Sequence, residues 1–184
     1  MSKQQQFLSY AHAFLVAADG HARAAKAKGV DGEVDGMMCI IALQNSVVGA
    51  IRTLGQGNHE VQKYKLVAGD LKDVRDMLTH FDEYALGEGK LQEKIAVSEP
   101  GAEEVDEVLE ELPDFFGWMP MWNSDETMMI LNRRKGEVEA TVYEVPIHEA
   151  LKNVAILVSA AAKSIGKKPS ALLEKLTETD DGSS

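Results

Sequence analysis

One short stretch of the chain carries side chains that could perform acid–base chemistry on a phosphate. Arg75, Asp76 and His80 occur there within six residues. An imidazole with a pKa of about 6.5 exchanges protons at neutral pH, so His80 could activate an RNA 2′-hydroxyl or protonate a leaving oxygen. Arg75 could hold the scissile phosphate with two hydrogen bonds, and Asp76 could orient either side chain. These three residues are the candidate catalytic residues.

The same stretch has the periodicity of an amphipathic helix. At about 100° per residue, its apolar residues fall on one arc. That arc comprises Leu71, Val74, Met77, Leu78, Phe81, Tyr84 and Ala85. Arg75 and His80 lie about 140° apart at the two margins of the polar arc, too far apart to act on one phosphate alone. A two-fold axis near Asp76 and Thr79 would close the gap, so we expect a homodimer.

The pattern Arg75-Asp76-x-x-x-His80 resembles the Arg-x(4 to 6)-His signature of HEPN domains, in which Asn, Asp or His commonly follows the Arg. The resemblance covers residues 1 to about 88 and the final helix. It implies a helical bundle, often dimeric. Many members cut RNA without a metal or cofactor, whereas others are non-catalytic scaffolds.

One toxin branch of that family is called HepT. The resemblance to this branch implies a second kind of partner, an antitoxin or other protein. In that branch the motif continues as His-x-Tyr, and the partner modifies the tyrosine. This chain departs from the pattern, because Asp82 occupies that position and the nearest tyrosine is Tyr84. The departure weakens both the toxin assignment and the antitoxin partner.

Composition separates two functional hypotheses. The formal net charge is −11, whereas a nucleic-acid footprint normally shows as net basicity. Around the motif, carboxylates also outnumber the cations Lys72 and Arg75. The first hypothesis is a metal-independent endoribonuclease with RNA as substrate. The second is a non-catalytic interaction or scaffold protein that works through its dimer face or the aromatic segment 115–122.

Two further groups of residues are candidates for substrate binding. Gln44 and Asn45 interrupt an apolar helix, so they either form core hydrogen bonds or line the cleft opposite Arg75 and His80. Three consecutive basic residues in a turn form either a solvated hairpin tip or a phosphate contact. These are Arg133, Arg134 and Lys135. The basic end of the first helix is either a dipole-compensating tail or a phosphate patch. It carries His21, Arg23, Lys26 and Lys28.

The fold class expected is mainly α, an up-and-down helical bundle of HEPN-like type with a β-hairpin inserted before the last core helix. The bundle helices are predicted near 3–28, 36–54, 59–86 and 148–165. A capping box from Ser2 to Gln5 and a C-cap at Gly29 bound the first helix. A kink is expected at Gly69.

The region 90–146 is expected to be an insertion within a single domain that spans 1–168. It contains an acidic helix, an aromatic cover over the bundle and the hairpin. These are predicted at 103–112, 114–125, and 127–132 with 137–145, with Val138, Ala140 and Val142 on one face of the second strand. A short helix is predicted at 169–176, and 177–184 reads as a disordered acidic tail.

Other classes of site are not expected. Cys39 is the only cysteine, so an intrachain disulfide is impossible, and a reducing cytoplasm fits the chain. The five histidines show no metal-ligand spacing. The longest uninterrupted apolar run, Met37 to Leu43, is far shorter than the roughly 20 residues of a membrane span.

Overall fold

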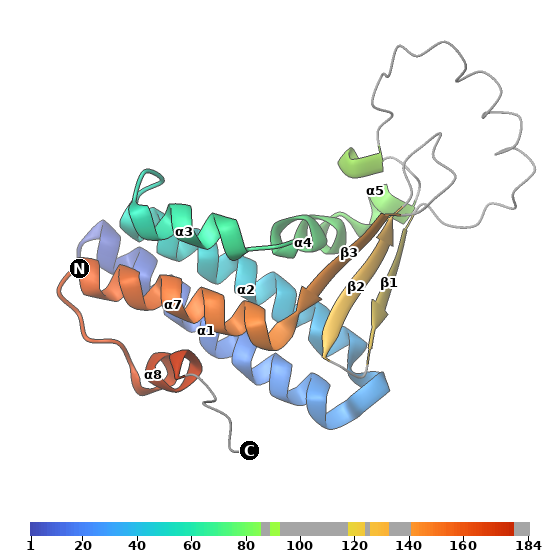
Figure 1. The fold of residues 1–184 in the computed structure, drawn as a ribbon, viewed down its shortest axis with the longest axis horizontal. Coiled ribbons are helices and arrows are strands. Elements are labelled where there is room, and N and C mark those ends of the chain that lie inside the picture. Colours follow the sequence, from blue (N-terminus) through green and yellow to red (C-terminus); the bar gives the residue numbers. More distant parts are fainter. Residues whose placement is uncertain (86–88, 93–117, 124–125, 133–140, 179–184) are drawn as a thin grey trace, which may run out of the picture.

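A computed structural model describes residues 1–85, 89–92, 118–123, 126–132 and 141–178. In these residues the protein is mainly helical with a small antiparallel sheet at one end of the helices (Figure 1). The predicted mainly-α class is therefore confirmed. The acidic helix, the hairpin tip and the tail from 179 onward lie outside the described residues.

Two long helices form the framework. α1 (Lys3–Lys28) passes through a 3-10 turn, η1 (Gly29–Gly32), into α2 (Glu33–Leu54), and the two pack along one another (Figure 1). The predicted capping box is present: Ser2 Oγ accepts from the Gln5 N–H at 3.2 Å, and Gln5 Oε1 accepts from the Ser2 N–H at 2.9 Å. Gly29 ends α1 with a φ of 58°, which confirms the predicted C-cap glycine.

Small residues allow α1 and α2 to approach closely. A Cβ placed on Gly49 would lie 2.9 Å from the backbone nitrogen of Ala11 and from the carbonyl oxygen of Phe7. Beside this contact, the buried Ser46 donates its Oγ–H to the Ala11 carbonyl at 2.8 Å. The hydroxyl thus has a partner in the core, and it helps to fix the register of the two helices.

The other helices complete the core around α2. α7 (Ile147–Ser164) packs on both α1 and α2, while α8 (Ala171–Thr177) packs on α7. α3 (His59–Val67) contacts α7, and α4 (Leu71–Thr79) contacts α2. One buried cluster joins all of these elements and includes sheet residues such as Ile130 and Val145.

The predicted third helix, 59–86, is wrong as a single element. It is divided into α3, α4 and α5 (Phe81–Ala85). The first break confirms the kink expected at Gly69, whose φ of 50° is a left-handed conformation. The second break, at His80, was not predicted. There the backbone leaves the helical conformation at φ −118° and ψ 38°.

Because of the break at His80, the Phe81 side chain does not lie on the buried face predicted for it. The periodicity places Phe81 on the buried arc, but its side chain is 60% exposed. The other large apolar residues of α4 are buried as predicted: Leu71, Val74, Met77 and Leu78. Phe81 leaves the arc because the projection assumes an uninterrupted helix, and that assumption fails one residue earlier.

The sheet has the strand order β1-β2-β3 and is antiparallel throughout. β2 (Thr127–Asn132) and β3 (Thr141–Pro146) confirm the predicted pairing, while β1 (Trp118–Trp122) was predicted only as an apolar cover. Pro120 is tolerated because β1 is an edge strand. On β3, Val142 is 43% exposed whereas Tyr143 and Val145 are buried, and the other two residues predicted to share the face of Val142 lie outside the described residues.

Hydrogen bonds between the sheet and the helical framework hold the sheet in place. Trp122 donates its indole N–H to the Gly29 carbonyl at 3.0 Å. Its ring lies against Gly36, where a Cβ would come within 2.6 Å of the ring. At the other edge, Asp70 Oδ2 accepts a hydrogen bond from the backbone N–H of Glu144 at 2.9 Å. The start of α4 is therefore tied to β3.

The hydropathy of the two long helices bears on the expectation that no segment spans a membrane. Within the continuous helical stretch Lys3–Leu54, an 18-residue window has a mean hydropathy of 1.5 and is apolar and long enough to cross a bilayer. Just over half of that window, 56%, is buried inside the bundle. A buried core helix meets the same criterion, so this helix is weak evidence for a span.

Candidate functional site

The candidate catalytic residues lie on the side of α4 and its C-terminus that faces away from the core. α4 buries its apolar arc against α2 and leaves Arg75 and Asp76 partly exposed, with His80 directly after its last residue. The amphipathic prediction is correct up to Thr79. The hydroxyl of Thr79 donates to the carbonyls of Arg75 and Asp76, at 3.0 and 3.1 Å, within the last turn of the helix.

Arg75 is held loosely. Its Nη1 lies 3.8 Å from Asp76 Oδ1, which is too long for the paired, parallel hydrogen bonds that guanidinium groups favour. Its Nε is buried and has no hydrogen-bond partner among the described residues. A buried donor on a charged group that lacks a hydrogen-bond partner carries a cost in stability.

His80 caps α4 through its backbone, because its N–H donates to the Asp76 carbonyl at 3.1 Å. Its imidazole is half exposed, and Nδ1 lies 3.6 Å from Glu83 Oε1. That distance exceeds a hydrogen bond, so Glu83 attracts the ring without fixing its orientation. Asp76 therefore lies at long range from Arg75, and Glu83 at long range from His80.

Tyr84, the tyrosine nearest the motif, is buried at 1% exposure. Its hydroxyl accepts a hydrogen bond from the Leu91 N–H at 3.3 Å, within η2 (Lys90–Gln92). A Cβ added to Gly89 would lie 2.4 Å from its ring. Burial raises the pKa of Tyr84, with a smaller contribution from the charge of Asp76. A phenol packed in this way is a poor acceptor for enzymatic modification.

Two of the predicted substrate-binding residues, Gln44 and Asn45, lie in the described part of the chain. Gln44 is buried in α2 and Asn45 is half-buried. Among the described residues, neither is hydrogen-bonded to Arg75 or His80. Arg133, Arg134 and Lys135 lie outside the described residues.

The basic end of α1 is engaged by carboxylates. Arg23 Nη2 lies 2.9 Å from Asp19, and Lys26 Nζ lies 2.6 Å from Glu126. Lys28 and His21 both contact Asp35. The Lys28 ammonium and then the His21 ring lower the pKa of the Asp35 carboxyl. Paired cations of this kind favour a structural role over a phosphate patch.

Within the described residues, no group of three or more His, Cys, Asp or Glu side chains is placed to hold a metal ion. Comparison of the chain with protein-family models, with curated proteins and with solved structures finds no match.

Sequence reasoning missed a contact elsewhere in the fold. His12 of α1 and Ser170, which caps α8, lie 158 residues apart in the chain, yet His12 Nε2 is 2.7 Å from Ser170 Oγ. No periodicity links two residues at that separation. The only local signal was the place of Ser170 before an apolar run, which indicates an N-cap.

Proposed function

We propose that the protein is a non-catalytic, HEPN-like interaction module that pairs with a second copy through the surface formed by α4 and α5. The HEPN resemblance supports a dimer but leaves open whether the site is catalytic. Both alternatives need the same surface, so its chemistry decides between them.

The observation that carries this proposal is the exposure of Phe81. Its ring is 60% exposed at the start of α5, directly after the break at His80. Aromatic side chains are enriched at the centres of protein interfaces, where they contribute much of the binding energy. An exposed phenylalanine beside charged residues therefore has the composition of an interface anchor with a polar rim.

The long contact of 3.8 Å between Arg75 Nη1 and Asp76 Oδ1 supports the same surface. A two-fold contact places the same patch of both chains face to face, so Arg75 of one copy would meet Asp82 and Glu83 of the other. The patch is self-complementary because it holds both signs of charge. Such a contact would give the Arg75 guanidinium a carboxylate at closer range than Asp76, which lies 3.8 Å away within one chain.

The charge around the motif disfavours RNA as a ligand. Asp73, Asp76, Asp82 and Glu83 surround Arg75 and His80 along α4 and α5. Phosphate binding normally requires an excess of cations, and those at the end of α1 already face carboxylates. The non-catalytic alternative is therefore the better supported one.

A metal-independent endoribonuclease remains the second candidate, and one observation favours it. The His80 imidazole is half exposed and beyond hydrogen-bond distance of Glu83, so it is free to transfer protons. In a dimer, His80 of one copy and Arg75 of the other would share one cleft. His80 would then act on the 2′-hydroxyl or the leaving oxygen, while Arg75 stabilises the phosphate charge.

One experiment tests the dimer surface that both candidates need, and a second experiment separates the candidates. Phe81→Ser should weaken self-association in sedimentation velocity at least about tenfold, as for a central interface residue. Val34→Ser removes another exposed apolar side chain, on α2, and should leave self-association unchanged. RNA cleavage is then measured in the presence of a chelator for the wild type, His80→Ala and His59→Ala. Cleavage lost only in His80→Ala would overturn the non-catalytic proposal, whereas equal backgrounds in all three support it.

A further inference from the structure

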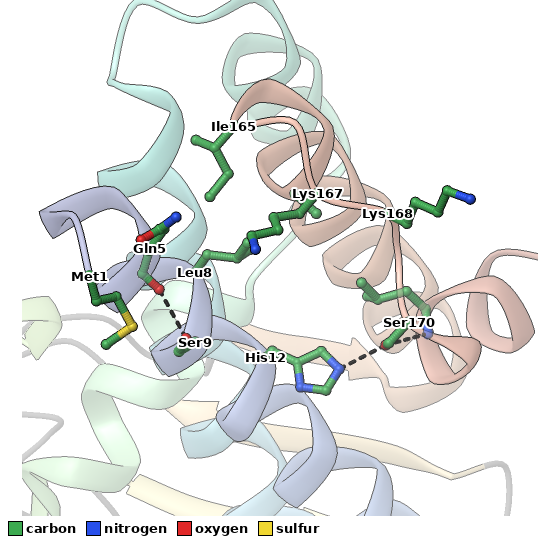
Figure 2. A pocket seen from close by; sticks show the side chains of 11 residues that line it. Met1, Gln5, Leu8, Ser9, His12, Ile165, Lys167, Lys168 and Ser170 are labelled. Atoms are coloured by element: carbon green, nitrogen blue, oxygen red, sulfur yellow. Dashed lines mark hydrogen bonds between the residues drawn. The ribbon is translucent and has the colours of Figure 1, made fainter.

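A cavity of about 440 Å³ lies where the N-terminal half of α1 meets the end of α7 and the start of α8 (Figure 2). It is at the opposite end of the bundle from α5 (Figure 1). Cavities of this size accept small molecules. The apolar part of its lining is formed by Met1, Leu8, Ala162, Ile165 and Leu173.

The turn between α7 and α8 brings the polar groups to this cavity. Gly166 adopts a φ of 71°, and its N–H donates to the Lys163 carbonyl, while the Lys167 N–H donates to Ala162. This is the hydrogen-bond pattern of a glycine-terminated helix. It reverses the chain and directs Lys167, Lys168 and Ser170 to the edge of the cavity.

His12 contributes from the α1 side. Its Nε2 lies 2.7 Å from Ser170 Oγ, and Figure 2 shows this pair at one edge of the cavity. Ser170 Oγ also accepts from the Leu173 N–H at 3.4 Å. A serine beside a histidine can also be a nucleophile. Here, however, the cavity lining holds no carboxylate to orient the His12 ring, so binding is the simpler role.

The charge of the lining contrasts with that of the chain. Among the described residues, the lining includes Lys167, Lys168 and His12 and no Asp or Glu, although the chain carries 30 acidic against 19 basic residues. In the part of the chain that the structure describes, neither lysine forms an ion pair. Lys167 extends toward Leu8 in Figure 2, whereas Lys168 extends outward. Unpaired cations beside an apolar surface suit an anion with an apolar tail.

We propose that this cavity binds an amphipathic anion, an alkyl chain with a carboxylate or phosphate head. The head group lies between Lys167 and the hydroxyl of Ser170, within reach of His12. The alkyl chain packs on Leu8, Ile165 and Leu173. This inference is independent of the α4–α5 surface.

The test titrates the full chain with decanoate, decyl phosphate, decanol and acetate and follows backbone amide shifts by NMR. Decanoate or decyl phosphate should bind with a Kd on the order of 1 mM or tighter, and shift the amides of Leu8, His12, Ser170 and Leu173. Decanol lacks the charge and acetate lacks the tail, so each should bind at least about fivefold more weakly. The two anions distinguish a carboxylate from a phosphate head.

A pair of double variants tests the role of the lysines. Lys167→Gln with Lys168→Gln should weaken binding of the alkyl anion about three- to tenfold, an effect that salt reduces. Lys65→Gln with Lys72→Gln removes the same charge from exposed positions on α3 and α4 and should leave the affinity unchanged. Equal affinity for decanol and decanoate, shifts confined to other residues, or equal effects of the two double variants would overturn the proposal.

Discussion

Asp70 and Glu144 connect the α4–α5 surface to the sheet: Oδ2 of Asp70 accepts a hydrogen bond from the backbone N–H of Glu144 at 2.9 Å. Asp70 immediately precedes α4, after the left-handed Gly69. The bond therefore fixes the entry of α4 against β3. Because α4 carries Arg75 and leads to His80, this contact also sets the position of the candidate site.

Asp70→Ala should lower the free energy of unfolding by about 1 kcal/mol, since a hydrogen bond to a charged acceptor is lost at a partly exposed position. Urea denaturation measures the change. Asp73→Ala is the matched control, because that carboxylate faces only Lys72, at 3.9 Å, and is 41% exposed. Equal losses in the two variants would show that the Asp70 contact does not hold α4 to the sheet.

Gly49→Ala should destabilise the protein by about 1 to 3 kcal/mol, the usual cost of overpacking a tight contact. The added methyl group would lie 2.9 Å from backbone atoms of Ala11 and Phe7. Gly20→Ala should instead stabilise the protein. A Cβ at Gly20 meets nothing within 4 Å, and alanine favours the helix by about 0.5 to 1 kcal/mol. Thermal unfolding of both variants checks the predicted order, and a neutral Gly49→Ala would contradict the close approach of α1 and α2.

Cys39 should resist thiol reagents in the native protein. It is fully buried in α2, and burial raises the pKa of its thiol to about 12, so the reactive thiolate is scarce at neutral pH. The reaction with a colorimetric disulfide reagent should be slow in buffer and fast in denaturant. Complete reaction within the mixing time in native buffer would contradict the burial.

The contacts of Asp35 with Lys28 and His21 predict that part of the stability of the protein depends on pH. Lys28 and His21 lower its pKa in the folded state below the reference value of 3.8. The stabilisation is therefore present above that value and is lost as the pH falls through the lower folded-state pKa. Asp35→Asn should thus lower the melting temperature more at pH 7 than at pH 3.

Asp31→Asn, in the same turn, provides the control for that measurement. Asp31 is exposed and forms no ion pair within the described residues. Its effect on the melting temperature should be small at both pH values. If the melting temperature of Asp35→Asn differed from that of the wild type by the same amount at pH 7 and pH 3, the assigned ion pairs would be ruled out.

Local signals explain why much of the helical framework could be predicted. The capping residues Ser2 and Gln5, the C-cap Gly29 and the kink at Gly69 each act within one or two turns of the backbone. The buried arc from Leu71 to Leu78 follows from a helical period alone. These features are therefore readable in the sequence without knowledge of the tertiary contacts.

The errors arose where distant contacts or breaks decide the structure. Phe81 was placed in the core because nothing in the sequence announces that the helix ends at His80. β1 was not predicted because Pro120 weakens the strand signal and the strand forms by pairing with β2. The cavity beside His12 and Ser170 depends on a contact between the two ends of the chain. The Arg75 and His80 pair could be located, but the role proposed for it depends on a second copy.

The central claim is that the surface carrying Arg75, His80 and Phe81 is an interface between two copies of the chain. Sedimentation velocity of the wild type across micromolar concentrations tests it most directly. We predict a species of about twice the 20.1 kDa chain mass, which Phe81→Ser converts to single chains while the circular dichroism spectrum stays unchanged. A 20.1 kDa species at every concentration, or a dimer unaffected by Phe81→Ser, would contradict the account.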